Sequence, residues 1–478
     1  MTRFTPLLAG AVAIVMTTSA VHAGEDAVHL LYRPGPMPRS NAFGAASATR
    51  PVAYDNRTTA RYLAQLAFRL ELGAARQKLA KWRMPVSVGL EWPGWQAYRA
   101  DIETLLALLR RQARVAIDLA DNGRPADIVV RIAPSIEMRR LLGSSFCITV
   151  PEHTTWNHFA TKFRAGSQAK WAELVDLRQA TIFIPDTAQP YLVRACLAEE
   201  IMQALGPAGD FYYLAQSSFN DDQMHLWPTA FDLLVLRVLY DDRLRPGMSR
   251  DEVERQARTV LDEIHASGRT AASRVTLVSD PAWETHFQRA QFMHHPKFAT
   301  DYYVEAIART EAMPAHDPRR LLTRFEAARN LLRYSPSEAY TKLNEIAQGY
   351  RALLGEGSVH EALARLEASH VDLWFKRFAR AGETAESLIE TFIAYGREDK
   401  VTEALLIRDA TREGRQRAAL LASSPSDTRA WANYAFGQRA PVTESSPPEP
   451  DPTDYSVLIA VLILGSILGV GYWRWRQT

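Results

Sequence analysis

The hydrophobic residues in the first half of the chain follow both helical and strand periods. Residues 58–82 and 94–114 carry apolar side chains every three or four positions, which predicts an amphipathic helix in each. Short apolar runs rich in β-branched residues predict five strands, at residues 85–91, 115–120, 127–134, 145–150 and 180–186. A further helix follows the last strand. The expected fold class of this part is therefore α+β, with a mixed sheet.

From about residue 299 onward the pattern becomes that of an all-helical array. Short breaks at Gly or Ser-Pro separate the helices, which we expect at residues 317–334, 335–355, 358–382, 383–396, 398–424 and 424–438. The joints at Ser335-Pro336 and Ser424-Pro425 resemble those of tetratricopeptide-like arrays, although no repeat of about 34 residues is present. Such layers bind peptides or partner proteins. The alternative is that the array packs on the first domain or spaces it from a membrane.

Both ends of the chain carry export and membrane signals. A basic start, a short apolar run and small residues before a cleavage point predict a signal peptide at residues 1–23. Residues 455–473 contain no charge and are just long enough to span a bilayer as a helix. Arg474 and Arg476 follow this span and favour the cytoplasmic side. We therefore expect a single-pass protein of the cell membrane, with its main body in the periplasm or outside the cell and its C-terminus cytoplasmic.

These signals divide the chain into regions. We expect a signal peptide (1–23), a disordered lead-in (24–57), the α+β domain (58–270), the helical domain (271–440), a Pro-rich linker (441–454), a transmembrane helix (455–473) and a cytoplasmic tail (474–478). Two alternatives concern the apolar end segment. It also resembles a sorting signal that is cut off, and the GxxxG formed by Gly465 and Gly469 could pack two spans together as a homodimer.

The composition limits the partners and the redox state. A net charge of +2, from 56 basic and 54 acidic residues, predicts neither a nucleic-acid partner nor a strongly anionic one. The two cysteines, Cys147 and Cys196, predict a disulfide in an oxidising compartment. Loop-entropy models give such a bridge roughly 4 kcal/mol.

The stretch CLAEEIMQALGPAGD, residues 196–210, has the spacing of a zinc-protease helix, H-E-x-x-H-x-x-G-x-x-H/D. Glu199, Gln203 and Asp210 occupy the ligand positions, and Glu200 occupies the position of the general base. Zinc prefers imidazole or thiolate at such positions, and a neutral amide is a poor ligand. We therefore expect no bound metal and no cofactor.

Four blocks, LAFRLELGA, ACLAEEIMQALGP, SSFNDD and FDLLVLRVLYDDRLRPGMSRDE, occur in order over residues 58–266. Together they resemble an uncharacterised family of exported bacterial proteins, domain of unknown function twenty-nine twenty-seven. The resemblance implies a metzincin-type, or zincin-like, fold whose helix often keeps Glu at its second position and Gln at its fifth. It implies no activity and no substrate.

Three interpretations of the altered helix stay open. In the first, its polar residues are structural and bond to one another and to backbone in a vestigial cleft. In the second, its carboxylates and Asp221 or Asp222 bind a divalent cation such as Ca²⁺, Mg²⁺ or Mn²⁺. In the third, the domain is a metal-dependent hydrolase with Glu200 as general base. We expect a membrane-anchored envelope protein with a non-catalytic cleft for a protein or peptide partner, and the hydrolase is the alternative.

Overall fold

The computed structural model describes residues 50–423, except for 71–74, 84, 121–124, 143–146, 189, 221, 271–279 and 294. The predicted signal peptide, linker, transmembrane helix and tail lie outside the described residues, as do Asp221, Gly465 and Gly469. Among the residues that are described, no helix is both long and apolar enough to cross a membrane. All of them belong to the compact unit that begins at Ala42.

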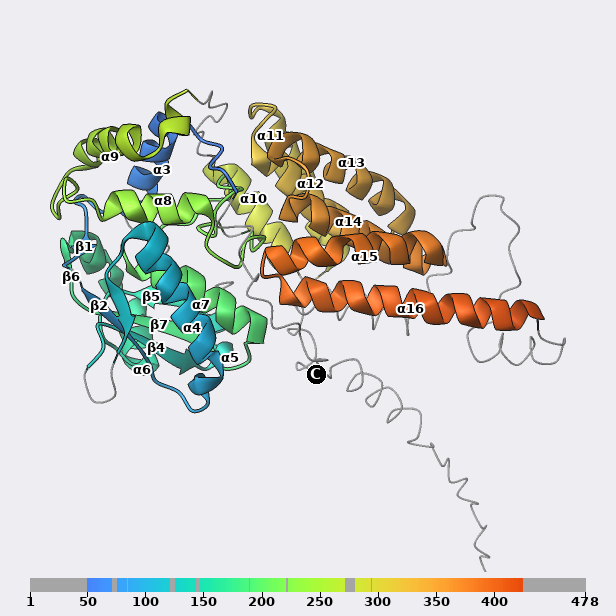
Figure 1. Cartoon of the computed structure of the whole chain (residues 1–478), viewed down its shortest axis with the longest axis horizontal. Helices are drawn as coiled ribbons and strands as arrows, with labels where there is room; N and C mark the ends of the chain where they lie inside the picture. Colours follow the sequence, from blue (N-terminus) through green and yellow to red (C-terminus); the bar gives the residue numbers. More distant parts are fainter. Residues whose placement is uncertain are drawn as a thin grey trace, which may run out of the picture. The chain divides into compact units, whose positions relative to one another are not determined.

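A five-stranded mixed sheet forms the centre of the first half, in the order β3-β2-β4-β7-β5 (Figure 1). The strands are β2 (Val86–Leu90), β3 (Ile117–Leu119), β4 (Ile128–Ala133), β5 (Ile148–Val150) and β7 (Ala180–Pro185). Neighbouring strands are parallel except at one edge, where β5 runs antiparallel to β7. Each strand lies within a range predicted from the sequence, so the five predicted strands are confirmed. A separate small sheet pairs β1 (Lys81–Trp82) with β6 (Asp176–Leu177).

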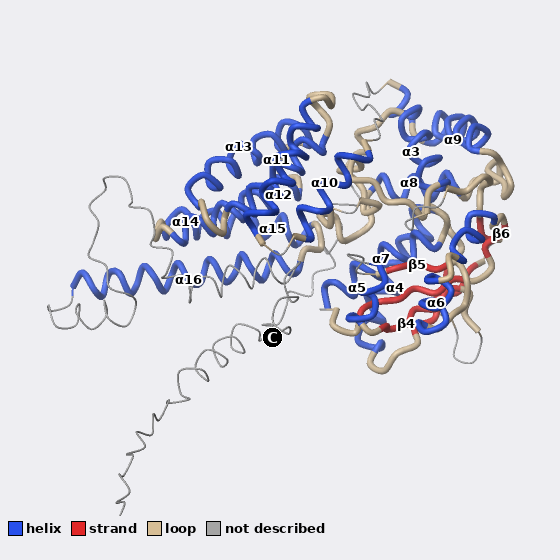
Figure 2. The backbone as a smooth tube through the Cα atoms, turned by 180° about the vertical axis from the view of Figure 1, so that it is seen from behind, coloured by secondary structure: helices blue, strands red, loops and turns tan. Residues whose placement is uncertain are grey.

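Helices precede, separate and follow the strands of this sheet, which are red in Figure 2. In chain order they are α3 (Asn56–Phe68), α4 (Arg99–Leu108), continued by a π-helical turn (Leu109–Ala113), then α5 (Ser135–Leu142), α6 (Trp156–Arg164), α7 (Pro190–Ala204), α8 (Ala230–Leu239) and α9 (Arg250–Ile264). Alternating residues of β7 divide the core. Ile182 and Ile184 join the cluster that contains α3, α4 and α7, whereas Phe183 joins the aromatic cluster of α6. The sheet is therefore covered on both faces.

The helix predicted over residues 58–82 is wrong beyond Phe68. The next residue, Arg69, is extended, with φ −108° and ψ 139°. Leu70 then packs into the aromatic cluster of α6 and β7, while the apolar face of α3 packs into the main core. One continuous helix could not bury both, so the chain leaves helical geometry between them.

The second half of the described chain is helical, as predicted. Its helices are α10 (Pro281–Phe292), α11 (Pro296–Glu311), α12 (Pro318–Leu331), α13 (Pro336–Leu354), α14 (Val359–Trp374), α15 (Phe378–Ala394) and α16 (Glu398–Ser423). Each packs against the next in sequence, which makes a series of helical hairpins. Their hydrophobic core also includes Tyr212 and Met224 from the first half of the chain. Proline starts α10 to α13, where its missing N–H has no helical acceptor.

The predicted break at residue 382 is misplaced. Helix α14 ends at Trp374, and the chain turns through Lys376 in the left-handed region at φ 59°. The N–H of Arg377 donates to the carbonyl of Asp372 at 2.8 Å, which closes the turn. Gly382, which marked the break in the sequence, is buried inside α15. The predicted helix over 424–438 lies outside the described residues.

Candidate functional site

Helix α7 carries the stretch whose spacing resembles that of a zinc-protease helix, and its apolar face anchors it. Leu197, Ile201 and Leu205 are buried, as their spacing predicts. Gly206 follows the helix with φ +129°, a backbone conformation that other residues rarely adopt. A side chain there would also meet Leu239 at 3.2 Å and a backbone oxygen at 3.3 Å. The helix end is therefore fixed by glycine.

Glu200 faces the edge strand β5. Its side chain is 4% exposed. The hydroxyl of Thr149 on β5 donates to Glu200 Oε2 at 2.7 Å and also lies 3.0 Å from the Glu200 carbonyl oxygen. One threonine thus ties the edge strand to both the side chain and the backbone of α7.

Gln203 and Asp210, two of the three ligand-position residues, are in contact. Gln203 Nε2 donates to Asp210 Oδ2 at 2.8 Å, and the Gln203 side chain is 3% exposed. Glu199 is half-buried on the same helix. Among the described residues, no three or more His, Cys, Asp or Glu side chains are grouped so that they could hold a metal ion. The side-chain amide of Gln203 thus binds the carboxylate of Asp210 in the position where a zinc-protease helix would carry a metal ligand.

The predicted disulfide between Cys147 and Cys196 is confirmed, with 6.0 Å between the two Cα atoms. It joins the residue before β5 to the middle of α7. The Thr149–Glu200 hydrogen bond lies close to it in sequence on both elements. The edge strand and the motif helix are therefore held together by one covalent and one polar link.

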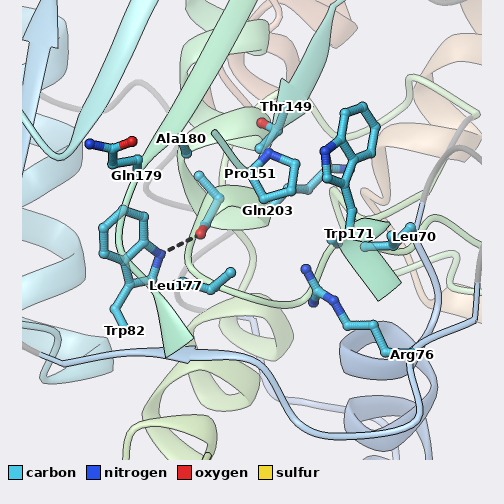
Figure 3. Close-up of a pocket in the computed structure, with 12 residues that line it drawn as sticks. Leu70, Arg76, Trp82, Thr149, Pro151, Trp171, Leu177, Gln179, Ala180 and Gln203 are labelled. Atoms are coloured by element: carbon cyan, nitrogen blue, oxygen red, sulfur yellow. Dashed lines mark hydrogen bonds between the residues drawn. The ribbon is translucent and has the colours of Figure 1, made fainter. Parts of the chain in front are cut away.

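A pocket opens beside these links, at the C-terminal end of α7 (Figure 3). Its cavity volume is about 30 Å³, and the surrounding depression of about 480 Å³ includes open solvent. Thr149 and Gln203 line it together with apolar walls. These walls include Leu70, Trp82, Pro151, Trp171 and Leu177. The pocket is thus adjacent to the altered motif and mainly apolar.

Two polar groups of the pocket hold the backbone of the helix ends. Trp82 Nε1 donates to the carbonyl of Ala204 at 2.6 Å, drawn as a dashed line in Figure 3. Arg76 Nη1 donates to the carbonyls of Gly206 at 3.0 Å and Ala67 at 3.4 Å. Burial lowers the pKa of Arg76 to about 10.

Sequence reasoning missed Arg76, Trp82 and Trp171 as site residues. The first two fall in the segment that was expected to be helical, and no motif marks any of the three. A correct end for α3 would have been the signal, because the residues after it, Leu70, Arg76 and Trp82, line the pocket.

Asp222, a candidate cation ligand, is held in a different environment. It accepts hydrogen bonds from Asn220 Nδ2 at 2.8 Å and from the N–H of Met224 at 2.9 Å. Its carboxylate lies 3.7 Å from Nε2 of His360 on α14. Burial raises the pKa of Asp222 to about 7. The structure therefore places this acid against the helical region.

Comparison with known proteins identifies one family. The model of a family described as "Protein of unknown function (DUF2927)" matches residues 56–259, which run from the start of α3 into α9. No curated protein and no solved structure matches the chain. The α+β part of the chain thus matches a family without an assigned activity.

Proposed function

We propose that the region from α3 to α9 is a degenerate zincin-like domain that binds a peptide segment of a partner protein without cleaving it. The order of its elements supports this proposal: a strand, a helix, further strands and then the helix with the altered motif. The observation that carries it is the apolar pocket between the edge strand β5 and the end of α7.

The edge strand offers a second part of the binding surface. Among the described strands, β5 pairs only with β7, so its other side has no strand partner there. An extended peptide can add to such an edge through main-chain hydrogen bonds, while adjacent pockets select its side chains. The disulfide and the Thr149–Glu200 hydrogen bond hold β5 in place, which lowers the cost of ordering it on binding.

Two side-chain contacts argue against cleavage. A zinc peptidase needs neutral imidazole or thiolate ligands and an open position for water. Here Gln203 donates to Asp210, and Glu200 is buried with its Oε2 accepting from Thr149. The retained glutamate favours the competing function, a metal-dependent hydrolase with Glu200 as general base.

The proposed setting is the bacterial envelope. The signal peptide expected at residues 1–23 would export the protein, and the span expected at 455–473 would anchor it with its C-terminus in the cytoplasm. The described helices α10–α16 would then lie on the same side of the membrane as the cleft. They would offer a second surface for a partner, or a spacer between the cleft and the membrane.

The test measures binding and cleavage together. Detergent-solubilised full-length protein is mixed with fluorescent random-sequence peptides, with and without zinc, and the bound and product peptides are identified by mass spectrometry. We expect binding without products, and unchanged binding by Glu200→Gln. Ala208→Trp, which fills the pocket, should abolish binding, and Ala165→Trp on an exposed turn should not.

Two results would count against the proposal. Peptide products that disappear in Glu200→Gln would establish the hydrolase instead. Binding that survives Ala208→Trp, or an absence of binding in the folded wild type, would remove the pocket from the function.

A further inference from the structure

Buried cations in this protein are normally paired with a carboxylate. The nearly buried basic side chains among the described residues are Arg76, Lys81, Arg319, Arg397 and Lys400. Three of them have a carboxylate partner: Arg319 with Asp317 at 2.6 Å, Arg397 with Asp399 at 2.7 Å, and Lys400 with Glu403 at 2.6 Å. This pairing is expected, because burying a charge without a partner is costly.

Lys81 and Arg76 bond to backbone carbonyls instead, and they differ from each other. Lys81 donates to the carbonyls of Asp241 and Leu244. Burial lowers the pKa of Lys81 to about 8, and the nearby carboxylates of Asp242 and Asp241 oppose this shift. For Arg76, burial lowers the pKa, and among the described residues its buried Nε atom has no hydrogen-bond partner. The carbonyls at the ends of α3 and α7 offset part of its charge.

Arg76 lines the pocket, and no acid lines it in the part of the chain that the structure describes, which leaves out residues 71–74. None of the residues that line the pocket is Asp or Glu, and Arg76 is the only lining residue with a permanent charge. Figure 3 shows the Arg76 side chain reaching from its loop toward the other lining residues. The side chain is 5% exposed, so its guanidinium group is desolvated before any ligand arrives. The complementary ligand is apolar and carries a negative charge.

We propose that this pocket binds the C-terminal end of a peptide, with its terminal carboxylate on Arg76 and an apolar last side chain against Trp82 and Trp171. This inference rests on the proposed function and specifies its ligand. A carboxylate and an apolar side chain share one α-carbon only at the end of a chain. An internal Asp or Glu would supply the carboxylate for Arg76, but the same residue would have no apolar side chain to pack against Trp82 and Trp171.

The geometry of the guanidinium group supports a paired contact. Nη1 is engaged by the two backbone carbonyls, whereas the buried Nε–H has no hydrogen-bond partner among the described residues. Guanidinium groups bind carboxylates through two parallel N–H donors, and a ligand carboxylate would have to enter the pocket to meet the buried edge that contains Nε. The carbonyl contacts hold the side chain in position before the ligand binds.

The test compares peptides that differ only at their end. The probes are labelled Ala-Ala-Ala-Leu with a free carboxylate, the same peptide as its amide, and Ala-Ala-Glu-Leu amide, titrated into the solubilised full-length protein by fluorescence anisotropy. We expect the free acid to bind at least about tenfold more tightly than either amide. Arg76→Gln should remove that preference, whereas Arg83→Gln, which removes an exposed charge, should keep it.

A second variant tests the same contact in case Arg76→Gln does not fold. Gln179 lines the pocket and is exposed, so Gln179→Glu adds a competing carboxylate without disturbing the core. It should weaken binding of the free acid and leave binding of the Ala-Ala-Ala-Leu amide, which has no carboxylate, unchanged.

The outcomes separate this inference from the proposed function. Equal binding of acid and amide would overturn the inference and leave peptide binding in place. Equal binding of the free acid and the glutamyl amide would overturn the assignment to a chain end. Failure of all three probes, together with failure of the random-sequence peptides, would overturn both proposals.

Discussion

The cleft beside α7 and the helical region differ in whether their buried charged side chains have an oppositely charged partner. In the helical region, acids of the buried helix α14 are matched by arginines: Glu361 with Arg351 at 2.8 Å, Glu367 with Arg329 at 3.0 Å, and Asp372 with Arg380 at 3.0 Å. In the cleft, Arg76 has only backbone carbonyls. Paired charges contribute to a specific packing, whereas an unpaired charge in a pocket leaves an interaction for a ligand to complete. This difference is the basis of our proposal that a ligand completes the cleft, whereas the helical region is packed without one.

The largest expected effect comes from breaking a buried pair at the start of α12. Asp317→Asn leaves Arg319 buried without a carboxylate, although it keeps an acceptor for the cap of α12. The free energy of unfolding should fall by about 3 kcal/mol, measured by chemical denaturation. Asp176→Asn, which removes the partner of the exposed Arg83, is the control and should change it by less than about 1 kcal/mol. Equal effects of the two changes would show that burial does not determine how much an ion pair contributes to the free energy of unfolding.

The second effect is a pH dependence from the buried cluster of Asp222, His225 and His360. Burial lowers the pKa of both histidines to about 3, so only the unfolded chain protonates them below about pH 6.5. Their stabilisation is therefore present above that pH and is lost on acidification. Burial raises the pKa of Asp222 to about 7. Between about pH 4 and 7 this carboxyl group is therefore protonated in the folded state and ionised in the unfolded chain.

The net difference is one proton, bound by the unfolded state. Between about pH 4 and 6.5 this cluster should lower the free energy of unfolding by about 1.4 kcal/mol for each pH unit of acidification. His360→Gln should remove that contribution, and Asp222→Asn should roughly double it, in denaturation measured across this range. Identical slopes in the wild type and both variants would contradict the assignment.

The smallest expected effect is at Arg76. Arg76→Met removes two hydrogen bonds to carbonyls, but it also removes a buried charge that has no carboxylate partner. The loss of stability should be about 1 kcal/mol, well below that of Asp317→Asn. Thermal and chemical denaturation check this value. A loss as large as that for Asp317→Asn would mean that Arg76 is primarily structural, which would weaken its role as an anchor.

The parts of the fold that depend on local patterns were predictable from the sequence. The five strands, the buried stripe of α7 and the disulfide all follow from spacing or residue count. The break between α14 and α15 was not predictable. Lys376 adopts a left-handed backbone conformation there, and a lysine in the sequence does not indicate such a conformation. Gly382 misled the prediction because it serves close packing inside a helix rather than a turn.

The candidate site was predictable only along α7. The motif spacing located Glu199, Glu200, Gln203 and Asp210, and the structure shows that two of them bond to each other. The rest of the pocket comes from three segments that are distant in sequence and meet only after α3 ends at Phe68. Long-range packing of this kind has no periodic signal, so Arg76 and Trp171 could not be assigned to the site beforehand.

The most direct test of the central claim is the zinc content of the purified protein after loading with zinc and removal of free metal. The proposal is that α7 forms no zinc centre, and we expect no stoichiometric zinc in the wild type. Glu199→His/Gln203→His, which restores two imidazoles beside Asp210, is the positive control and should gain zinc. Stoichiometric zinc in the wild type that is lost on Gln203→Ala would contradict the account.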